Sequence, residues 1–255
     1  MLKLLNKPCL PENKVAVSVI SSEQPEIIRR LHDDFMIESI IIDQNKSLSD
    51  DISSHPDCVF LQLDTETVFS DRNKSSCIVN FLTNKEYVEF NTILSSGPVC
   101  SPYPGDIRLN VRVIGNNIIC NSKYIDINLK NYAEKSGFRI IHCNQGYAAC
   151  SSIVLNDNAL ITDDPTIHSS AQLNGIDSVI IRKGSVKLKC REYGFIGGTC
   201  GMIDKNILAF TGCLDSHIDS ALIKSFLNKH SISYVELTDG PLVDIGGIIP
   251  LFELC

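Results

Sequence analysis

The chain of 255 residues contains no tryptophan, only three methionines and 7% aromatic residues. No apolar run approaches the roughly 20 residues that a membrane-spanning helix needs, so we expect no transmembrane segment. The apolar start of the chain is too short for the core of a secretory signal, because Pro8 interrupts it. The P-loop, G-x-G-x-x-G and G-x-S-x-G motifs are also missing, which excludes the common phosphate-loop, dinucleotide and serine-hydrolase signatures.

The eleven cysteines form no C-x-x-C pair and show no Cys/His ligand spacing, so we predict no metal and no cofactor. Several of them, such as Cys58, Cys120 and Cys190, stand in apolar runs, where cysteine behaves as a small hydrophobic residue. A reduced, cytoplasmic protein is the better interpretation. The net charge of −7 argues against nucleic acid as a partner and is compatible with a cationic small molecule.

A unit of two apolar runs around a polar turn, a helix-like stretch and a third apolar run recurs five times. Asparagine or glutamate anchors these turns at Asn13, Glu66, Asn117, Asn158 and Asn206, with intervals of 53, 51, 41 and 48 residues. This period is typical of a ββαβ unit, and an internal period of this size usually decides the fold. We predict one α/β domain over 1–255, a five-repeat ββαβ propeller, with repeats at about 10–43, 55–94, 104–143, 147–182 and 196–238.

The third repeat is the plainest example. Residues 107–113 alternate as a strand, Gly115 begins a tight turn, 118–121 return, 124–136 read as a helix, and 138–142 close the unit. Helices are also expected after Ser22, after Asp215 or Ser216, and within 82–94. The first repeat lacks its leading strand, and a closing strand at about 245–252 is expected to supply it. The alternative is an ordinary α+β domain with chance hairpins.

In a ring of such units, the segment before each leading strand points toward the central axis. These segments are 53–57, 101–106, 144–150, 193–200 and 240–247, and all are rich in Gly, Pro or polar residues. Glycine permits close approach of the backbone, and a ligand pocket needs that together with a few polar groups. We therefore expect Asp106, Asn144, Cys200 and Asp244 to approach one central cavity.

The fivefold ββαβ pattern and the loops around Asn144, Tyr193 and Asp244 resemble the pentein, or α/β-propeller, superfamily, in a bacterial branch of it. That superfamily includes dimethylarginine dimethylaminohydrolase, arginine and agmatine deiminases, glycine amidinotransferase and a non-enzymatic ribosome anti-association factor. The resemblance covers about residues 50–252. It implies a pocket in which a cysteine thiolate attacks a guanidinium carbon while carboxylates hold the planar N–H groups.

The resemblance carries over to some positions and not to others. Asp106 matches a substrate-gripping acid, and Gly246 and Gly247 match the glycine pair that precedes the nucleophile in the enzymes. Apolar residues follow this pair, so the usual His and Cys are missing there, and Asn144 or Gln145 stands where the enzymes have their general-base histidine.

Cys200, after a Gly-Gly-Thr run, is the best remaining nucleophile, with a buried core residue as the alternative. We assign Cys200, Asp106 and Asp244 as catalytic. The expected ligand-binding residues are Asp57, Tyr103, Asn144, Gln145, Gly197, Gly198, Gly246 and Gly247. Turn formation, loop capping and aromatic packing are the alternatives for these residues.

Three other residues near the expected site are interpreted as structural. Cys150 reads as a core residue, and His55 and His217 read as solvent-facing.

Two functions remain open from the sequence. One is an atypical guanidino- or amidino-group hydrolase or transferase that acts on an arginine-like small molecule. The other is a non-catalytic pentein-fold protein that binds a small polar ligand or another protein.

Overall fold

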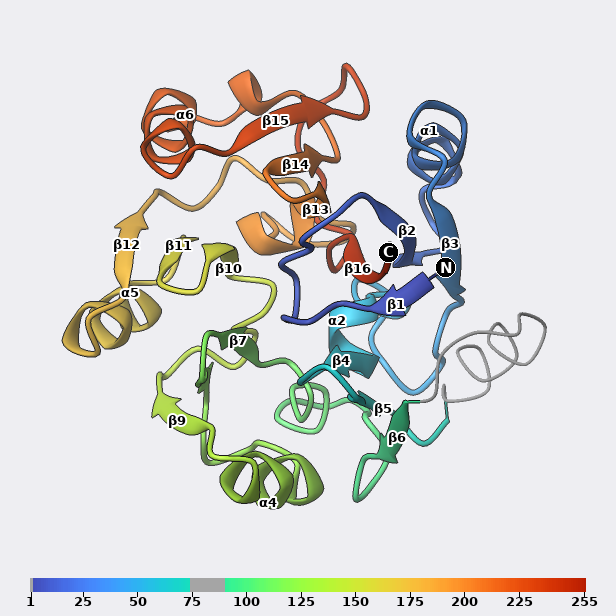
Figure 1. Ribbon diagram of the computed structural model, residues 1–255, viewed down its shortest axis with the longest axis vertical. Coiled ribbons are helices and arrows are strands. Elements are labelled where there is room, and N and C mark those ends of the chain that lie inside the picture. The colour runs from blue at the N-terminus through green and yellow to red at the C-terminus, as the bar shows by residue number, and fades with distance from the viewer. Residues whose placement is uncertain (1, 74–89) are drawn as a thin grey trace.

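In the computed structural model, which describes residues 2–73 and 90–255, five small sheets lie around the centre of the molecule (Figure 1). The four helices α1 (Pro25–Phe35), α4 (Ile127–Lys135), α5 (Pro165–Leu173) and α6 (Ser220–Lys229) lie at its periphery. No helix in these two ranges is long and apolar enough to cross a membrane.

In the four three-stranded sheets, the middle strand pairs antiparallel with one neighbour and parallel with the other, and one inner strand of the four-stranded first sheet has the same two kinds of partner. The strands of the second and third sheets are β4 (Phe60–Gln62), β5 (Thr67–Ser70), β6 (Asn91–Leu94), β7 (Arg112–Ile114), β8 (Asn117–Cys120) and β9 (Arg139–His142). The fourth and fifth contain β10 (Ser152–Asn156), β11 (Ala159–Thr162), β12 (Asp177–Ile180), β13 (Cys200–Asp204), β14 (Ile207–Phe210) and β15 (Ser233–Glu236). In the first, third, fourth and fifth units, the parallel pairing follows from the helix that crosses between the last two strands: α1, α4, α5 and α6 respectively.

The first sheet is built from both ends of the chain. Its order is β1 (Leu2–Leu4), β16 (Ile249–Leu254), β2 (Val15–Ser21) and β3 (Glu38–Ile42). The C-terminal strand thus pairs antiparallel with β2, in the position of the leading strand that the first repeat lacks. Glu253 is completely buried, and its Oε2 accepts hydrogen bonds from the backbone N–H groups of Glu12 and Asn13 at 2.6 and 2.7 Å. This carboxylate fixes the first polar turn against the C-terminal strand.

Side-chain caps explain where two of the helices begin. Asp126 accepts hydrogen bonds from the backbone of α4, and Asp164 does the same for α5, which also has proline in its first turn. At the other end of α4, Gly137 adopts a φ of +81°, which ends the helix as the sequence predicted.

Some element boundaries differ from the prediction. The third unit begins its first strand only at Arg112, because the chain turns at residues 108–109 and forms no strand over 107–111, although Ile107, Leu109, Asn110 and Val111 are buried. Helix α6 begins at Ser220, after a short 3-10 turn at Leu214–Ser216, so Asp215 and Ser216 do not cap it. Residues Asn91–Leu94 are strand β6 rather than helix, residue 90 is not helical, and the part of the expected helix at 82–89 lies outside the described residues.

Candidate functional site

The segment 53–57 places two polar side chains at the buried centre. His55 precedes the short helix α2 (Pro56–Val59), and Asp57 lies in its first turn. Only 4% of His55 and 6% of Asp57 are exposed. The interpretation of His55 as solvent-facing is wrong. The residue directly precedes helix α2, and its side chain is buried. His217, 3% exposed, is also buried, and its Nδ1 accepts a hydrogen bond from the backbone N–H of Asp219 at 3.0 Å.

Cys150 joins this pair from a different unit of the chain. Its Sγ donates to Oδ2 of Asp57 at 2.6 Å, and one donor atom each of His55, Asp57 and Cys150 lies within 4.8 Å of the others. Asn110 holds the cysteine in place. Its Nδ2 donates to the Sγ at 3.3 Å, and its Oδ1 accepts from the backbone N–H of Ala149 at 2.8 Å. Cys150 is thus buried, as expected, but against polar groups.

Asp244 closes the other side of His55. Its Oδ1 lies 3.8 Å from Nδ1 of His55 and accepts from the backbone N–H of Gly246 at 3.0 Å, while Oδ2 accepts from the N–H of Phe195 at 2.9 Å. A Cβ added to Gly198 would lie 1.8 Å from the Oδ1 of Asp244. Glycine is required at that position because the carboxylate occupies the space of a side chain.

Close contacts or positive φ angles also explain why glycine stands at position 197 and at positions 246–247. A Cβ on Gly197 would lie 2.4 Å from the carbonyl oxygen of Ala149, and one on Gly246 would lie 2.6 Å from Cβ of His55. Gly246 and Gly247 have φ values of +73° and +84°. These glycines let the segments that carry Asp244, His55 and Cys150 meet at the centre.

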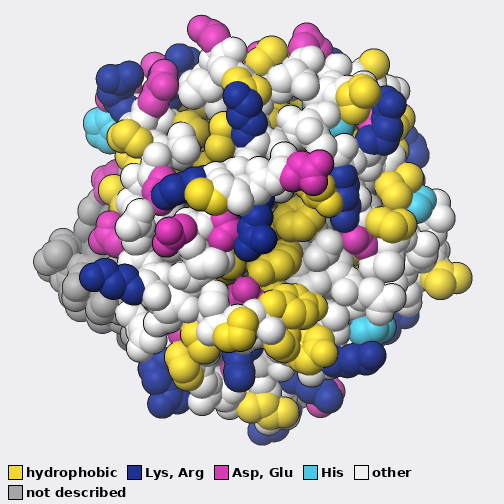
Figure 2. All heavy atoms as spheres, turned by 180° about the vertical axis from the view of Figure 1, so that it is seen from behind, with side chains coloured by type: hydrophobic (Ala, Val, Ile, Leu, Met, Phe, Trp, Pro, Cys, Tyr) yellow, Lys and Arg dark blue, Asp and Glu magenta, His cyan; other side chains and the backbone are white. Residues whose placement is uncertain are grey.

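A cavity of about 430 Å³ opens onto these groups; it is lined by His55, Cys150, Asp244, Tyr103, Tyr147, Phe195, Asp51, Ile52, Leu188, Arg191, Glu192 and Tyr193. Its size falls within the range of small-molecule sites. On the face shown in Figure 2, hydrophobic side chains gather around a hollow near the centre, with basic and acidic side chains at its border.

Four aromatic rings line this cavity in a continuous row, and a fifth, Tyr124, packs against the end of the row. Tyr103 contacts Tyr124 and Tyr147 at centroid distances of 6.1 and 6.3 Å, and Phe195 contacts Tyr147 and Tyr193 at 6.1 and 6.4 Å. Tyr147 also donates its hydroxyl hydrogen to Oδ2 of the buried Asp106 at 2.8 Å. Asp106 thus reaches the cavity wall through this tyrosine.

Burial governs the protonation of the central groups. It raises the pKa of Asp57 to about 6, helped by the negative charge of Asp244 and opposed by His55. Burial also raises the pKa of the Cys150 thiol well above its ordinary value, and that of the Tyr147 hydroxyl. Near neutral pH, the Cys150 side chain is a thiol that donates to the carboxylate of Asp57.

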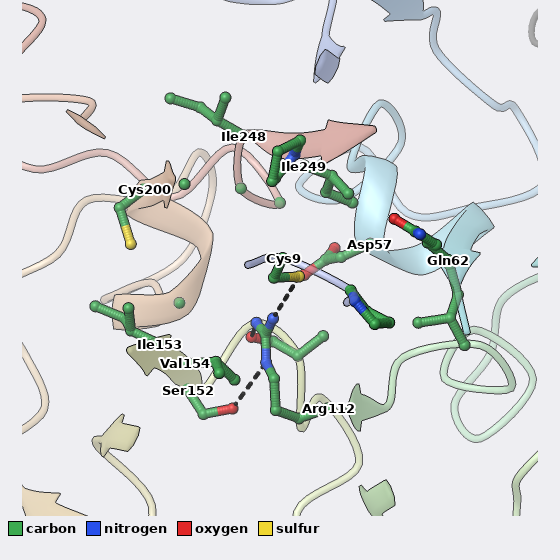
Figure 3. Close-up of a pocket in the computed structure, with 18 of the residues that line it drawn as sticks. Cys9, Asp57, Gln62, Arg112, Ser152, Ile153, Val154, Cys200, Ile248 and Ile249 are labelled. Carbon is green, nitrogen blue, oxygen red and sulfur yellow. Dashed lines mark hydrogen bonds between the residues drawn. The ribbon is translucent and has the colours of Figure 1, made fainter. Parts of the chain in front are cut away.

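A second, smaller cavity of about 60 Å³ contains Cys200 (Figure 3). There the guanidinium of Arg112 donates from Nε to Oγ of Ser152 at 3.2 Å and from NH1 to Sγ of Cys9 at 3.5 Å. Asp57 also lines this cavity, so the Asp57–Cys150 pair lies between the two cavities. Burial raises the pKa of the Cys200 thiol to about 12.

The residues expected to meet in one cavity are therefore divided. Asp244 lines the larger cavity and Asp106 reaches it through a tyrosine, whereas Cys200 lines the smaller one. Asn144 is exposed and lines neither cavity. Gln145 donates from its Nε2 to Asp164 at 3.0 Å and thereby braces a loop.

Comparisons with known proteins identify the sequence family of this chain and solved structures that share its fold. The model of a family of unknown function, DUF6873, matches residues 19–249. The chain belongs to this family. Its sequence has no significant match among curated proteins.

Solved structures of several guanidino-modifying enzymes share the fold. A complex of Pseudomonas aeruginosa DDAH with citrulline aligns with a TM-score of 0.55 at 7% identity, over 94% of this chain and 99% of that one. Agmatine deiminase from C. jejuni gives a TM-score of 0.53 at 11% identity, over 95% and 94%. SxtG, an amidinotransferase from Microseira wollei, gives 0.57 at 9% identity, over 91% of each chain. The fold of this DUF6873 protein is that of the pentein superfamily.

Proposed function

We propose that the larger cavity binds a small molecule with a planar, cationic guanidinium or amidinium group, and that Cys150 attacks the central carbon of that group. One observation carries the proposal: His55, Cys150 and the buried Asp244 line an aromatic-walled cavity, and Asp57 accepts a hydrogen bond from Cys150 behind that lining. Cys200, in the other cavity, is the alternative nucleophile. Asp106 and Asp244, which the sequence assigns as catalytic together with Cys200, are proposed as the acids that hold the ligand.

The lining suits a planar cation. A guanidinium presents paired N–H groups that match a carboxylate in bidentate geometry. Asp244 is a buried carboxylate of this lining. Directly behind the lining, Asp57 accepts from Cys150 and Asp106 accepts from Tyr147, and among the described residues Oδ1 of each of these two acids is buried without a hydrogen-bond partner. The rings of Tyr103 and Tyr147 add faces that attract a cation, and the third ring, Phe195, already has Nζ of Lys183 at 5.5 Å from its centroid.

The proposed reaction forms a bond between Sγ of Cys150 and the guanidinium carbon. The thiol proton passes to Asp57, which already accepts a hydrogen bond from that thiol and whose pKa of about 6 suits a base near neutral pH. The carbon–nitrogen bond to the leaving amine then breaks, and the amine takes a proton from the His55–Asp57 pair. Water cleaves the carbon–sulfur bond and restores the thiol.

The charge of the lining favours a ligand without a carboxylate group. Arg191 is the cationic residue that lines the cavity, and its Nε donates to Oδ2 of Asp51 at 2.6 Å. A ligand carboxylate would compete with that pair and would face Glu192 and Asp244. We therefore propose an agmatine-like compound rather than a free amino acid such as arginine.

Calorimetric titration with agmatine, arginine and methylated arginines tests binding, and release of amine or ammonia tests turnover. We expect agmatine to bind best. Cys150→Ser is expected to retain binding and lose turnover, while Cys200→Ser, a matched change of a buried cysteine, is expected to retain both. Loss of turnover in Cys200→Ser alone would reassign the nucleophile, and no binding of any cation would refute the proposal.

A non-catalytic binding protein is the second candidate, and a specific observation favours it. The raised pKa of the Cys150 thiol opposes formation of the nucleophilic thiolate. Binding of agmatine without turnover under any of the conditions tested would select this candidate.

We also propose that the five sheets are the blades of one closed, pseudo-fivefold propeller in a single domain, with β16 completing the first blade. The shared strand pattern and the pairing of β16 with β2 support this arrangement. A cytoplasmic location is proposed with it, supported by the free thiols of the ten described cysteines.

A further inference from the structure

We propose that His55, Asp57 and Cys150 bind one divalent transition-metal ion of the zinc type. The three residues offer one donor atom each within 4.8 Å of one another, and all three are buried. They come from segments 93 residues apart, so the short ligand spacings by which zinc sites are found in sequences do not apply. The metal site does not depend on the proposed guanidinium chemistry.

Two of the donor groups have unused binding capacity. Among the described residues, Nδ1 of His55 and Oδ1 of Asp57 are buried without a hydrogen-bond partner. An unpaired buried polar atom of this kind destabilises the folded protein. A bound cation would satisfy both atoms, and an apolar ligand would satisfy neither.

The set of donors selects the type of ion. A thiolate, an imidazole and a carboxylate together suit Zn²⁺ and Co²⁺, whereas Mg²⁺ and Ca²⁺ prefer oxygen donors alone. Asp244 has an oxygen 3.8 Å from Nδ1 of His55 and is the candidate for a fourth ligand. The cavity that His55 and Cys150 line offers the ion a path from solvent.

The surroundings hold the donors in place. Asn110 donates to Sγ of Cys150, helix α2 carries Asp57 next to His55, and Gly246 packs against the His55 side chain. Partners of this kind orient ligands, and their loss typically weakens metal binding by about 10–100-fold. We expect Asn110→Ala to weaken binding by such a factor.

Binding requires one proton to leave and a small movement. The Cys150 thiol releases its proton to solvent, and the sulfur forms a bond to the metal in place of the hydrogen bond to Asp57. Sγ of Cys150 now lies 2.6 Å from Oδ2 of Asp57, and it must move away from that oxygen. Bonds of about 2.3 Å to the sulfur and about 2.0 Å to Oδ1 at a tetrahedral angle would place these two ligand atoms about 3.5 Å apart. If the proposed function holds, the same ion blocks the nucleophile and inhibits turnover.

Titration of the metal-free full-length protein with Co²⁺ tests the site. We expect one equivalent to bind with a thiolate-to-cobalt charge-transfer band, which Zn²⁺ abolishes and Mg²⁺ leaves unchanged. Cys150→Ser is expected to lose the band. Cys200→Ser, an equal change at another buried cysteine, is expected to keep it.

The variants must be shown to fold before binding is compared. Far-UV circular dichroism checks this, and His55→Gln and Asp57→Asn provide two further variants that should lose the site. An unchanged band in folded Cys150→Ser, or no stoichiometric Co²⁺ binding by the wild type, overturns the inference. Metal binding without any binding of guanidinium compounds would refute the proposed function and leave the metal site standing.

Discussion

Replacing Asp57 by Asn should stabilise the protein at neutral pH. The folded protein holds the pKa of this carboxyl at about 6, against an ordinary value of 3.8, because burial disfavours the charge. The contribution of the protonated Asp57 side chain to the free energy of unfolding of the wild type is therefore fully present below pH 4, and it is lost as the pH rises through 6. The difference between a pKa of about 6 in the folded protein and the ordinary value of 3.8 lowers the free energy of unfolding at pH 7 by about 3 kcal/mol.

A weaker hydrogen bond from Cys150 opposes the stabilisation that Asp57→Asn is expected to give. Cys150 donates to the Asp57 carboxylate, and a neutral amide oxygen is a weaker acceptor by about 1 kcal/mol. The net expectation for Asp57→Asn is a stabilisation of about 1–3 kcal/mol at pH 7 and no gain near pH 4. Asp163, whose pKa burial raises to about 7, titrates in both proteins and cancels in the difference.

Urea unfolding at pH 4, 5, 6 and 7 measures the difference, followed by circular dichroism because the chain has no tryptophan. Asp239→Asn removes the same charge from an exposed position and serves as the matched control, with no expected change across this range. An Asp57→Asn variant that is less stable at pH 7, or that keeps the wild-type pH profile, would refute the account of Asp57 as a costly buried charge.

Three further predictions follow from packing and exposure. Gly198→Ala should lower the free energy of unfolding in urea by at least about 1–3 kcal/mol, because the added Cβ would clash with Asp244. Gly97→Ala is the control and should have almost no effect, since its Cβ would lie 3.6 Å from the nearest atom. Equal effects of the two changes would contradict the packing around Gly198. Truncation before Ile248 removes β16 from between β1 and β2 and should abolish cooperative unfolding; an unchanged transition would contradict closure by this strand. In the native protein, an alkylating reagent should modify the exposed Cys190 long before the buried cysteines, as read by mass spectrometry, and fast labelling of a buried one would contradict its inert environment.

Local signals made much of the fold predictable. Polar turns between short apolar runs located the hairpins, and Pro25 and Gly137 marked helix ends that the structure contains. The C-terminal strand was predictable because the first repeat lacked a partner for β2. The strand β1 was not, since three residues carry too little periodicity to identify a strand.

The candidate site was only partly predictable, because its contacts join distant parts of the chain. Asp57, Asp244 and the glycines around them follow from turn chemistry and from the common position of the leading segments. The roles of His55 and Cys150 do not, since a cysteine beside alanines looks like a core residue until the fold places it against a carboxylate. The order His-Pro-Asp at the start of a helix was the one local signal for His55.

Agmatine binding to two variants tests the central claim that buried carboxylates of the larger cavity hold a guanidinium group. Calorimetric titration compares Cys150→Ser, which cannot turn the ligand over, with the double variant Cys150→Ser, Asp244→Asn, because Asp244 is a buried carboxylate that lines the larger cavity. We expect one equivalent to bind to the first and an affinity about 10–100-fold lower in the second, as for the loss of one charged hydrogen-bond acceptor. Equal affinities for the two variants, or no binding to either, would contradict the account.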